Sequence, residues 1–68
     1  MGRFRFCMIG TGQAPVIDVD ETSLREICET IDRHRFLLGR LIEIDGYGTS
    51  CGVLIPTSRI QMICEVEQ

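Results

Sequence analysis

Apolar residues fall at every second position near the start of the chain. Within residues 3–9, two phenylalanines and a methionine alternate with other residues, the spacing that places side chains on one face of a strand. Residues 10–15 then contain two glycines and a proline, which favour a loop. A short apolar segment over 16–19 follows. We therefore expect two short strands that form a hairpin.

The next apolar residues recur with the period of a helix. Leu24, Ile27, Cys28 and Ile31 lie at positions i, i+3, i+4 and i+7, with charged residues between them. Ser23 precedes an acidic residue by three positions, as in a capping box. These features predict an amphipathic helix that buries Leu24, Ile27 and Ile31 against a sheet or a partner.

Three further strands are expected in the second half of the chain. Residues 36–44 are apolar on both faces, which fits a central strand or a strand in a subunit interface. Asp-Gly-Tyr-Gly at 45–48 predicts a tight turn, and the returning strand over 51–55 ends at a proline. A corner at 57–58 then leads to a last strand over 59–66. We expect these three strands to form an antiparallel meander. The inward side chains of the last strand are expected to be Ile60, Met62, Cys64 and Val66, with Ile63 out of phase.

The order β-β-α-β-β-β predicts an α+β fold. We expect residues 1–68 to form a single domain with a small, mainly antiparallel sheet or partly closed barrel of four to five strands and one amphipathic helix.

Composition adds the expectation of a partner. A chain of 68 residues buries only about 60% of the surface of its unfolded form, yet 44% of its residues are hydrophobic and its mean hydropathy is +0.13. Apolar surface should therefore remain for a second subunit, and a homodimer is the default. The edges of the first and last strands are a second option for this contact. The expected interface residues are Phe4, Phe6, Leu37, Leu41 and Ile63.

Charge and cysteine content argue against several other classes of protein. The net charge is −3, with seven arginines and ten carboxylates, which disfavours a general polyanion binder. The four cysteines contain no C-x-x-C pair and there is a single histidine, so we expect no metal and no other cofactor. No apolar run approaches the ~20 residues of a membrane-spanning helix. We expect a cytoplasmic protein without a membrane partner.

Candidate catalytic features are sparse. The glycines of residues 10–15 suggest a dinucleotide-binding turn, but a proline replaces the third glycine and an apolar segment follows in place of a helix. His34 stands between two arginines, and no nucleophile is placed beside it by the sequence pattern. We assign no catalytic residues, and an enzyme is less well supported than a binding protein.

A candidate binding surface is formed by cationic residues and one aromatic residue. Three of them follow the predicted helix, where positive charge also stabilises the helix dipole, so a purely structural role is an alternative. The candidate residues are Arg33, His34, Arg35, Tyr47 and Arg59.

The segments 39–47, 53–56 and 59–63 together resemble the strand pattern of Sm-like RNA-binding barrels. Members of that family begin with a helix and close with two short strands separated by a tight turn. The resemblance implies a small barrel, ring assembly and RNA as a partner. This chain has Pro-Thr-Ser-Arg at 56–59, where the family places RNA-contacting residues.

The leading hypothesis is a non-catalytic, homo-oligomeric protein-interaction or regulatory module that also binds a protein partner. The alternative is a small Sm-like RNA-binding barrel, although RNA is not the favoured partner. A third is an enzyme or ligand-binding subunit whose site forms between protomers.

Overall fold

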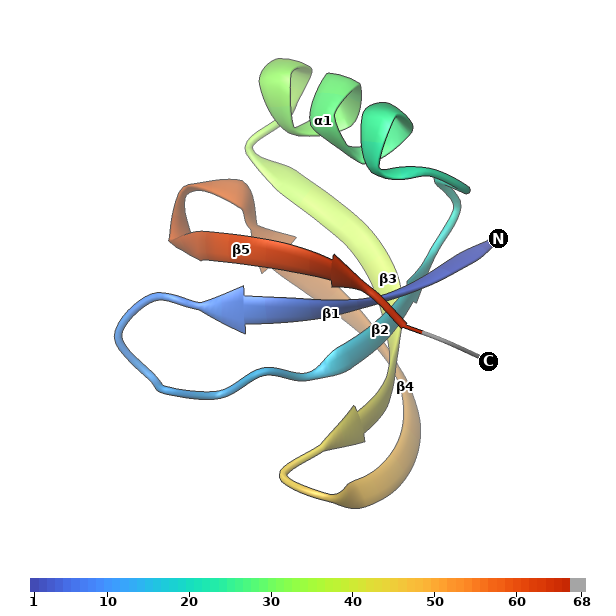
Figure 1. Ribbon diagram of the computed structural model, residues 1–68, viewed down its shortest axis with the longest axis vertical. Coiled ribbons are helices and arrows are strands. Elements are labelled where there is room, and N and C mark those ends of the chain that lie inside the picture. The colour runs from blue at the N-terminus through green and yellow to red at the C-terminus, as the bar shows by residue number, and fades with distance from the viewer. Residues whose placement is uncertain (67–68) are drawn as a thin grey trace.

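The alternating and helical sequence patterns form the elements that they predict. The computed structural model, which describes residues 1–66, contains one α-helix and five strands (Figure 1). In chain order these are β1 (Gly2–Met8), β2 (Val16–Val19), α1 (Leu24–Arg33), β3 (Phe36–Ile44), β4 (Tyr47–Pro56) and β5 (Ile60–Glu65), with the 3-10 helix η1 (Thr57–Arg59) before β5. The predicted α+β fold and its element order are confirmed.

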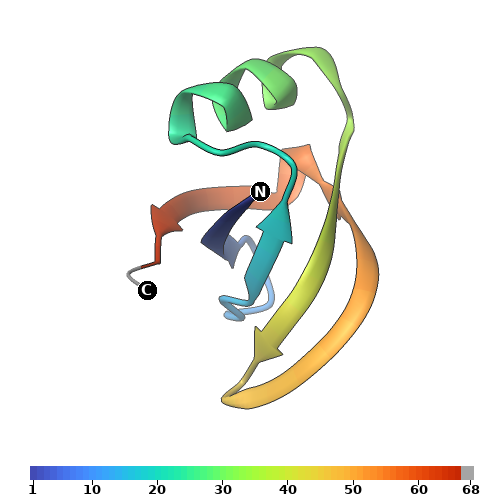
Figure 2. The ribbon, with the colours of Figure 1, turned by 90° about the vertical axis from the view of Figure 1, so that its right-hand side faces the viewer.

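The strands form one antiparallel sheet in the order β4-β3-β2-β1-β5. The last strand pairs with β1 and not with β4, so the expected meander is wrong. In η1, Thr57 donates from its backbone N–H to the carbonyl of Arg35 at 2.8 Å and from its hydroxyl to the carbonyl of His34 at 3.0 Å. These bonds fix a corner that sends β5 to the opposite edge of the sheet. Figures 1 and 2 show β1 and β5 running across β3 and β4.

The side chains of β5 change face because its pairing with β1 contains an extra residue. Ile60 and Met62 are opposite consecutive residues of β1, so Gln61 between them has no partner there. Such a β-bulge reverses the alternation beyond it. Ile60 and Ile63 consequently both pack against the core, while Met62 is 55% exposed. The structure thus reverses the predicted orientations of Met62 and Ile63.

The core lies between the inner face of the sheet and α1. Ile27, at 1% exposed, is the buried residue of α1 and packs into a cluster of strand side chains. The buried strand residues of this cluster are Phe4, Phe6, Ile17, Val19, Leu37 and Ile55. Ile31 is partly buried against the cluster, but Leu24, which was expected to be buried, is 40% exposed. The helix is therefore held at the centre of its apolar stripe, and the rest of the stripe is left at the surface.

Local hydrogen bonds define both ends of α1. The hydroxyl of Ser23 accepts a hydrogen bond from the backbone N–H of Glu26 at 3.2 Å, as the sequence predicts. The carboxylate of Glu26 in turn accepts hydrogen bonds from the backbone N–H and the hydroxyl of Thr22. At the other end, the N–H of His34 donates to the carbonyl of Thr30 at 3.0 Å, and the chain then becomes extended.

The predicted turn between β3 and β4 is also present. Asp45 and Gly46 both have positive φ, 52° and 83°, as a type I′ turn requires. This two-residue connection sets the register in which Ile44 pairs with Tyr47. The turn lies at the end of the molecule opposite α1 (Figure 1).

Candidate interaction surfaces

The side chains predicted as a binding surface do not come together. Arg33, His34 and Arg35 are exposed at the junction of α1 and β3, whereas Tyr47 begins β4 beyond the far end of β3. The longest dimension of the molecule is 31 Å, and Figure 1 shows α1 at one end of it and the β3–β4 turn at the other. Arg59 lies in η1, where its carbonyl accepts a 2.7 Å hydrogen bond from the segment after β1. The cationic cluster and the aromatic ring thus belong to separate surfaces.

The residues predicted as a subunit interface mostly face the interior of their own chain. Phe4, Phe6 and Leu37 are buried in the core, at 3%, 0% and 2% exposed. Leu41 and Ile63 are partly buried and pack against the same cluster. The sequence pattern did identify apolar faces, but the fold uses these residues internally because they alternate with the outward ones along each strand. The free apolar surface lies elsewhere.

An apolar patch covers the outer face of β3 and β4. Phe36 pairs with Pro56 across the two strands, and Leu38 pairs with Leu54. These residues alternate with the buried Leu37, so they lie on the face of the sheet away from the core and α1. Leu38 is 71% exposed and Leu54 is 62% exposed. We call Phe36, Leu38, Leu54 and Pro56 the hairpin patch.

A second apolar surface lies where α1 faces β5. A hollow of about 270 Å³ lies between the two elements. Figure 2 shows α1 above β5, which is an edge strand of the sheet. We call this hollow the helix–strand groove. Its apolar lining comes from Leu24, Cys28 and Ile31 of α1 and from Ile60, Met62 and Ile63 of β5. Both elements therefore contribute exposed apolar side chains to one surface.

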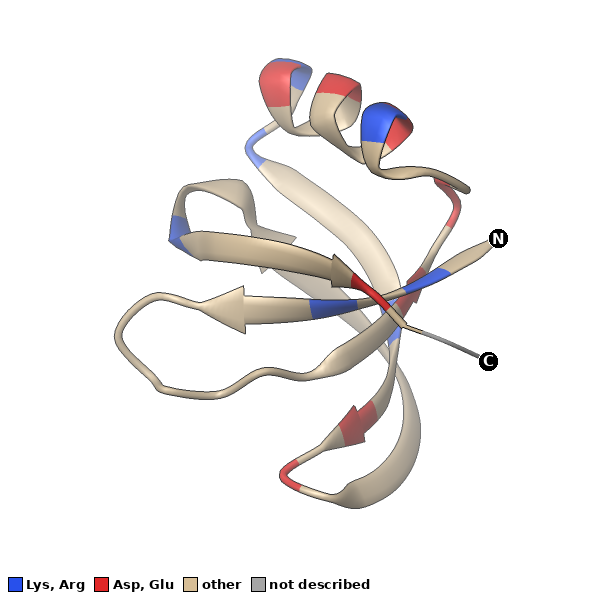
Figure 3. Cartoon of the chain, in the orientation of Figure 1, with Lys and Arg blue, Asp and Glu red and all other residues tan. Residues whose placement is uncertain are grey.

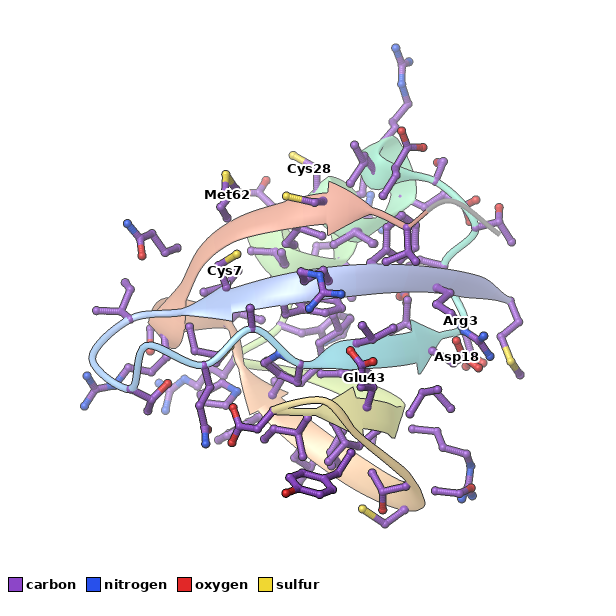
Figure 4. All side chains as sticks on the ribbon, turned by 60° about the horizontal axis from the view of Figure 1, so that its bottom comes forward. Arg3, Cys7, Asp18, Cys28, Glu43 and Met62 are labelled. Atoms are coloured by element: carbon purple, nitrogen blue, oxygen red, sulfur yellow. The ribbon has the colours of Figure 1, made fainter. Side chains whose placement is uncertain are left out.

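The outer face of β1, β2 and the second half of β3 carries charged side chains that form ion pairs with one another. Arg3 holds Asp18 through two contacts, Nε to Oδ1 at 2.7 Å and Nη2 to Oδ2 at 3.0 Å (Figure 4). The hydrogen bonds from Arg3 hold the pKa of Asp18 below its usual value. Arg5 Nη2 lies 3.6 Å from Glu43 Oε1, and Val16, which pairs with both of these residues, is buried between them. The charges of Arg3 and Arg5 on this face are thus paired with those of Asp18 and Glu43.

Groups that carry chemistry are dispersed in the described part of the chain. Within residues 1–66 no three His, Cys, Asp or Glu side chains gather closely enough to hold a metal ion. All four cysteines are free thiols. The glycine-containing segment forms the β1–β2 hairpin loop, in which Gly10 and Gly12 have positive φ. It is followed by a strand, so it lacks the helix that a dinucleotide-binding turn requires.

The described residues contain no helix with the length and apolar character needed to cross a membrane.

Comparisons with protein families, curated proteins and solved structures found no match to this chain.

Proposed function

We propose that this protein is a non-catalytic, self-associating protein-interaction module. The observation that carries the proposal is the hairpin patch, in which two apolar cross-strand pairs lie side by side on the outer face of the sheet. The chain has one α-helix in its described part, and that helix packs on the opposite face. Apolar patches of this kind on small proteins commonly mark protein-binding sites.

The size of the chain supports self-association. A typical stable interface covers roughly 800 Å² on each partner, which is about one sixth of the 4777 Å² surface of this protein. Either apolar surface, with its polar rim, could contribute to such an area. Because most homo-oligomers close through two-fold symmetry, we propose a dimer. One surface would be buried in the dimer, and the other would remain for a different protein.

The alternative of RNA binding has less support. Several arginine–phosphate contacts and stacked bases would need cationic and aromatic side chains on one surface. Arg33 and Tyr47 instead lie near opposite ends of the longest dimension of the molecule.

Sedimentation velocity over a range of protein concentrations tests the proposal. We expect the sedimentation coefficient to rise with concentration in the micromolar range. Replacing an apolar residue in the contact surface by a charged one should abolish this rise. Leu38→Glu tests the hairpin patch and Met62→Glu tests the helix–strand groove. Tyr47→Glu is the matched control, because Tyr47 is 76% exposed at the far end of β3–β4.

All of these substitutions are at exposed positions, so the variants should remain folded. A wild-type protein whose sedimentation coefficient stays at the monomer value throughout would contradict self-association. Equal loss of association in all three variants would show that the effect comes from added charge and not from a defined surface.

A further inference from the structure

Charged residues flank the midpoint of the apolar edge of α1 with opposite sign. Cys28, which lines the helix–strand groove, has Arg25 three residues before it and Asp32 four residues after it. Residues at these spacings are neighbours on a helix surface. All three are exposed. Along the groove edge of α1, a positively charged residue is therefore followed by an apolar one and then by a negatively charged one. Figure 3 shows charge of both signs along the helix.

The β5 side of the groove has a charged residue at each end of the strand. Met62 is three residues from Arg59, which precedes β5, and three residues from Glu65, which ends it. Both charged residues are exposed, and Met62 is 55% exposed. In the pairing of β5 with β1, Met62 is opposite Cys7 and Glu65 is opposite Phe4, so the side chains of Met62 and Glu65 lie on different faces of the strand. The pattern of a positive, an apolar and a negative residue on one surface is therefore that of α1.

The two midpoints lie beside each other. Cys28 and Met62 line the same hollow, and Figure 4 shows both on the side of the molecule where α1 and β5 meet. In Figure 1 the two elements run in opposite directions, so Arg25 lies at the Glu65 end of the groove and Asp32 at the Arg59 end. A two-fold axis through the middle of the groove exchanges its two ends.

We propose that the helix–strand groove is the contact between two copies of this chain, related by a two-fold axis that passes near Cys28 and Met62. This inference rests on the proposed self-association. In such a dimer α1 lies antiparallel to the α1 of its partner. Arg25 then faces the partner's Asp32, and Asp32 faces the partner's Arg25. The surface is thus complementary to itself in charge, as an isologous contact requires.

The dimer also covers apolar residues that the fold leaves open. Cys28 and Met62 lie beside their symmetry mates, Leu24 packs toward the partner's Ile31, and the hollow is closed. The hairpin patch lies on the opposite face of the sheet and stays exposed in both subunits. The dimer therefore presents two copies of that patch to another protein.

Charge reversal followed by rescue tests this geometry in the 68-residue chain. Arg25→Asp alone places two like-charge pairs in the dimer, and so does Asp32→Arg alone. We expect each single variant to raise the dimer Kd about tenfold or more. The double variant exchanges the two charges and should return Kd to within about threefold of wild type. Sedimentation equilibrium measures all four values.

The variants suit this test because neither substitution should destabilise α1. Asp near the amino end and Arg near the carboxyl end of α1 both complement the helix dipole. Arg33→Asp is the matched control for Arg25→Asp, since it makes the same change of net charge about 140° around the helix from Cys28. Its Kd should stay within about threefold of wild type. Circular dichroism of each variant verifies that the helix is retained.

Two kinds of failure can be separated. If wild type dimerises but the single reversals leave Kd unchanged, or the double variant does not recover, the groove geometry is wrong while self-association stands. Loss of the dimer in Leu38→Glu together with its retention in Met62→Glu would then assign the contact to the hairpin patch. A wild-type protein that is monomeric at all concentrations overturns both proposals.

Discussion

Replacing Ile27 by alanine tests how α1 is attached to the sheet. Ile27 is 1% exposed and is the residue of α1 that joins the buried core cluster. Replacing isoleucine by alanine in a core costs about 2–5 kcal/mol, depending on how far the site can relax. The helix–strand groove borders Ile27, so its neighbours have room to move. We therefore expect a loss of about 2–3 kcal/mol in the free energy of unfolding.

That loss is large for a domain of this size. A chain of 68 residues is expected to have a total unfolding free energy of about 3–10 kcal/mol. With a urea slope of about 1 kcal/mol per M, the midpoint should fall by about 2 M or more. Urea titration followed by far-UV circular dichroism measures the shift at one fixed protein concentration.

Glu29→Ala provides the control for this experiment. Glu29 is exposed on the same helix, and its replacement by a good helix former should change stability by less than about 0.5 kcal/mol. If Ile27→Ala changed stability by no more than this control does, α1 would not be anchored through Ile27, and the groove beside it would have no fixed shape.

Three further predictions concern the strands and the charged residues. Gly39→Ala should lower the unfolding free energy by about 1–3 kcal/mol in urea titration, because an added Cβ would lie 2.5 Å from Ile17 Cγ2 and 2.9 Å from the carbonyl oxygen of Asp18; a neutral effect would show that β2 and β3 are less closely packed. The lowered pKa of Asp18 means that its bond to Arg3 stabilises the fold above the ordinary Asp pKa of about 3.9 and that this contribution is lost as pH falls through the lower, folded value. The stability advantage of wild type over Asp18→Asn should therefore shrink between pH 5 and pH 2, and parallel pH profiles would argue against the ion pair. Fluorescence titration with mixed single-stranded RNA at low salt should show no binding at micromolar protein, whereas tight binding that weakens in both Arg33→Ala and Tyr47→Ala would favour the RNA-binding alternative.

The sequence predicted the local structure well because local signals determine it. Ser23 caps α1, Asp45 and Gly46 form the turn between β3 and β4, and the short second strand pairs with the first. Each of these features depends on residues within a few positions of one another. Capping side chains and glycines at positive φ carry their structural meaning in the sequence itself.

The non-local pairing of β5 could not be predicted from the same kind of signal. An apolar strand after a tight corner fits a meander and a crossover equally well, and the choice depends on the Thr57 hydrogen bonds to the end of α1. The bulge at Gln61 could not be predicted either. One inserted residue exchanges the faces on which the following side chains lie, and it does so without changing the apolar composition of the strand. This is why the predicted orientations of Met62 and Ile63 were reversed.

The candidate surfaces, too, were predictable only as far as local signals determine them. The apolar residues on both faces of β3 indicated that one face would be left over, which the hairpin patch bears out at Leu38. Which face that would be depended on the pairing partners of β3, so Leu37 was assigned to an interface although it is buried in the core. The exposed positions Leu54 and Met62 had no sequence signal that separated them from core residues.

Sedimentation equilibrium of the wild-type protein at tens of micromolar tests self-association most directly. We predict a mass of twice that of the 7.7 kDa chain, falling toward the monomer value on dilution. A mass that stays at 7.7 kDa, in a protein that still unfolds cooperatively, would contradict it.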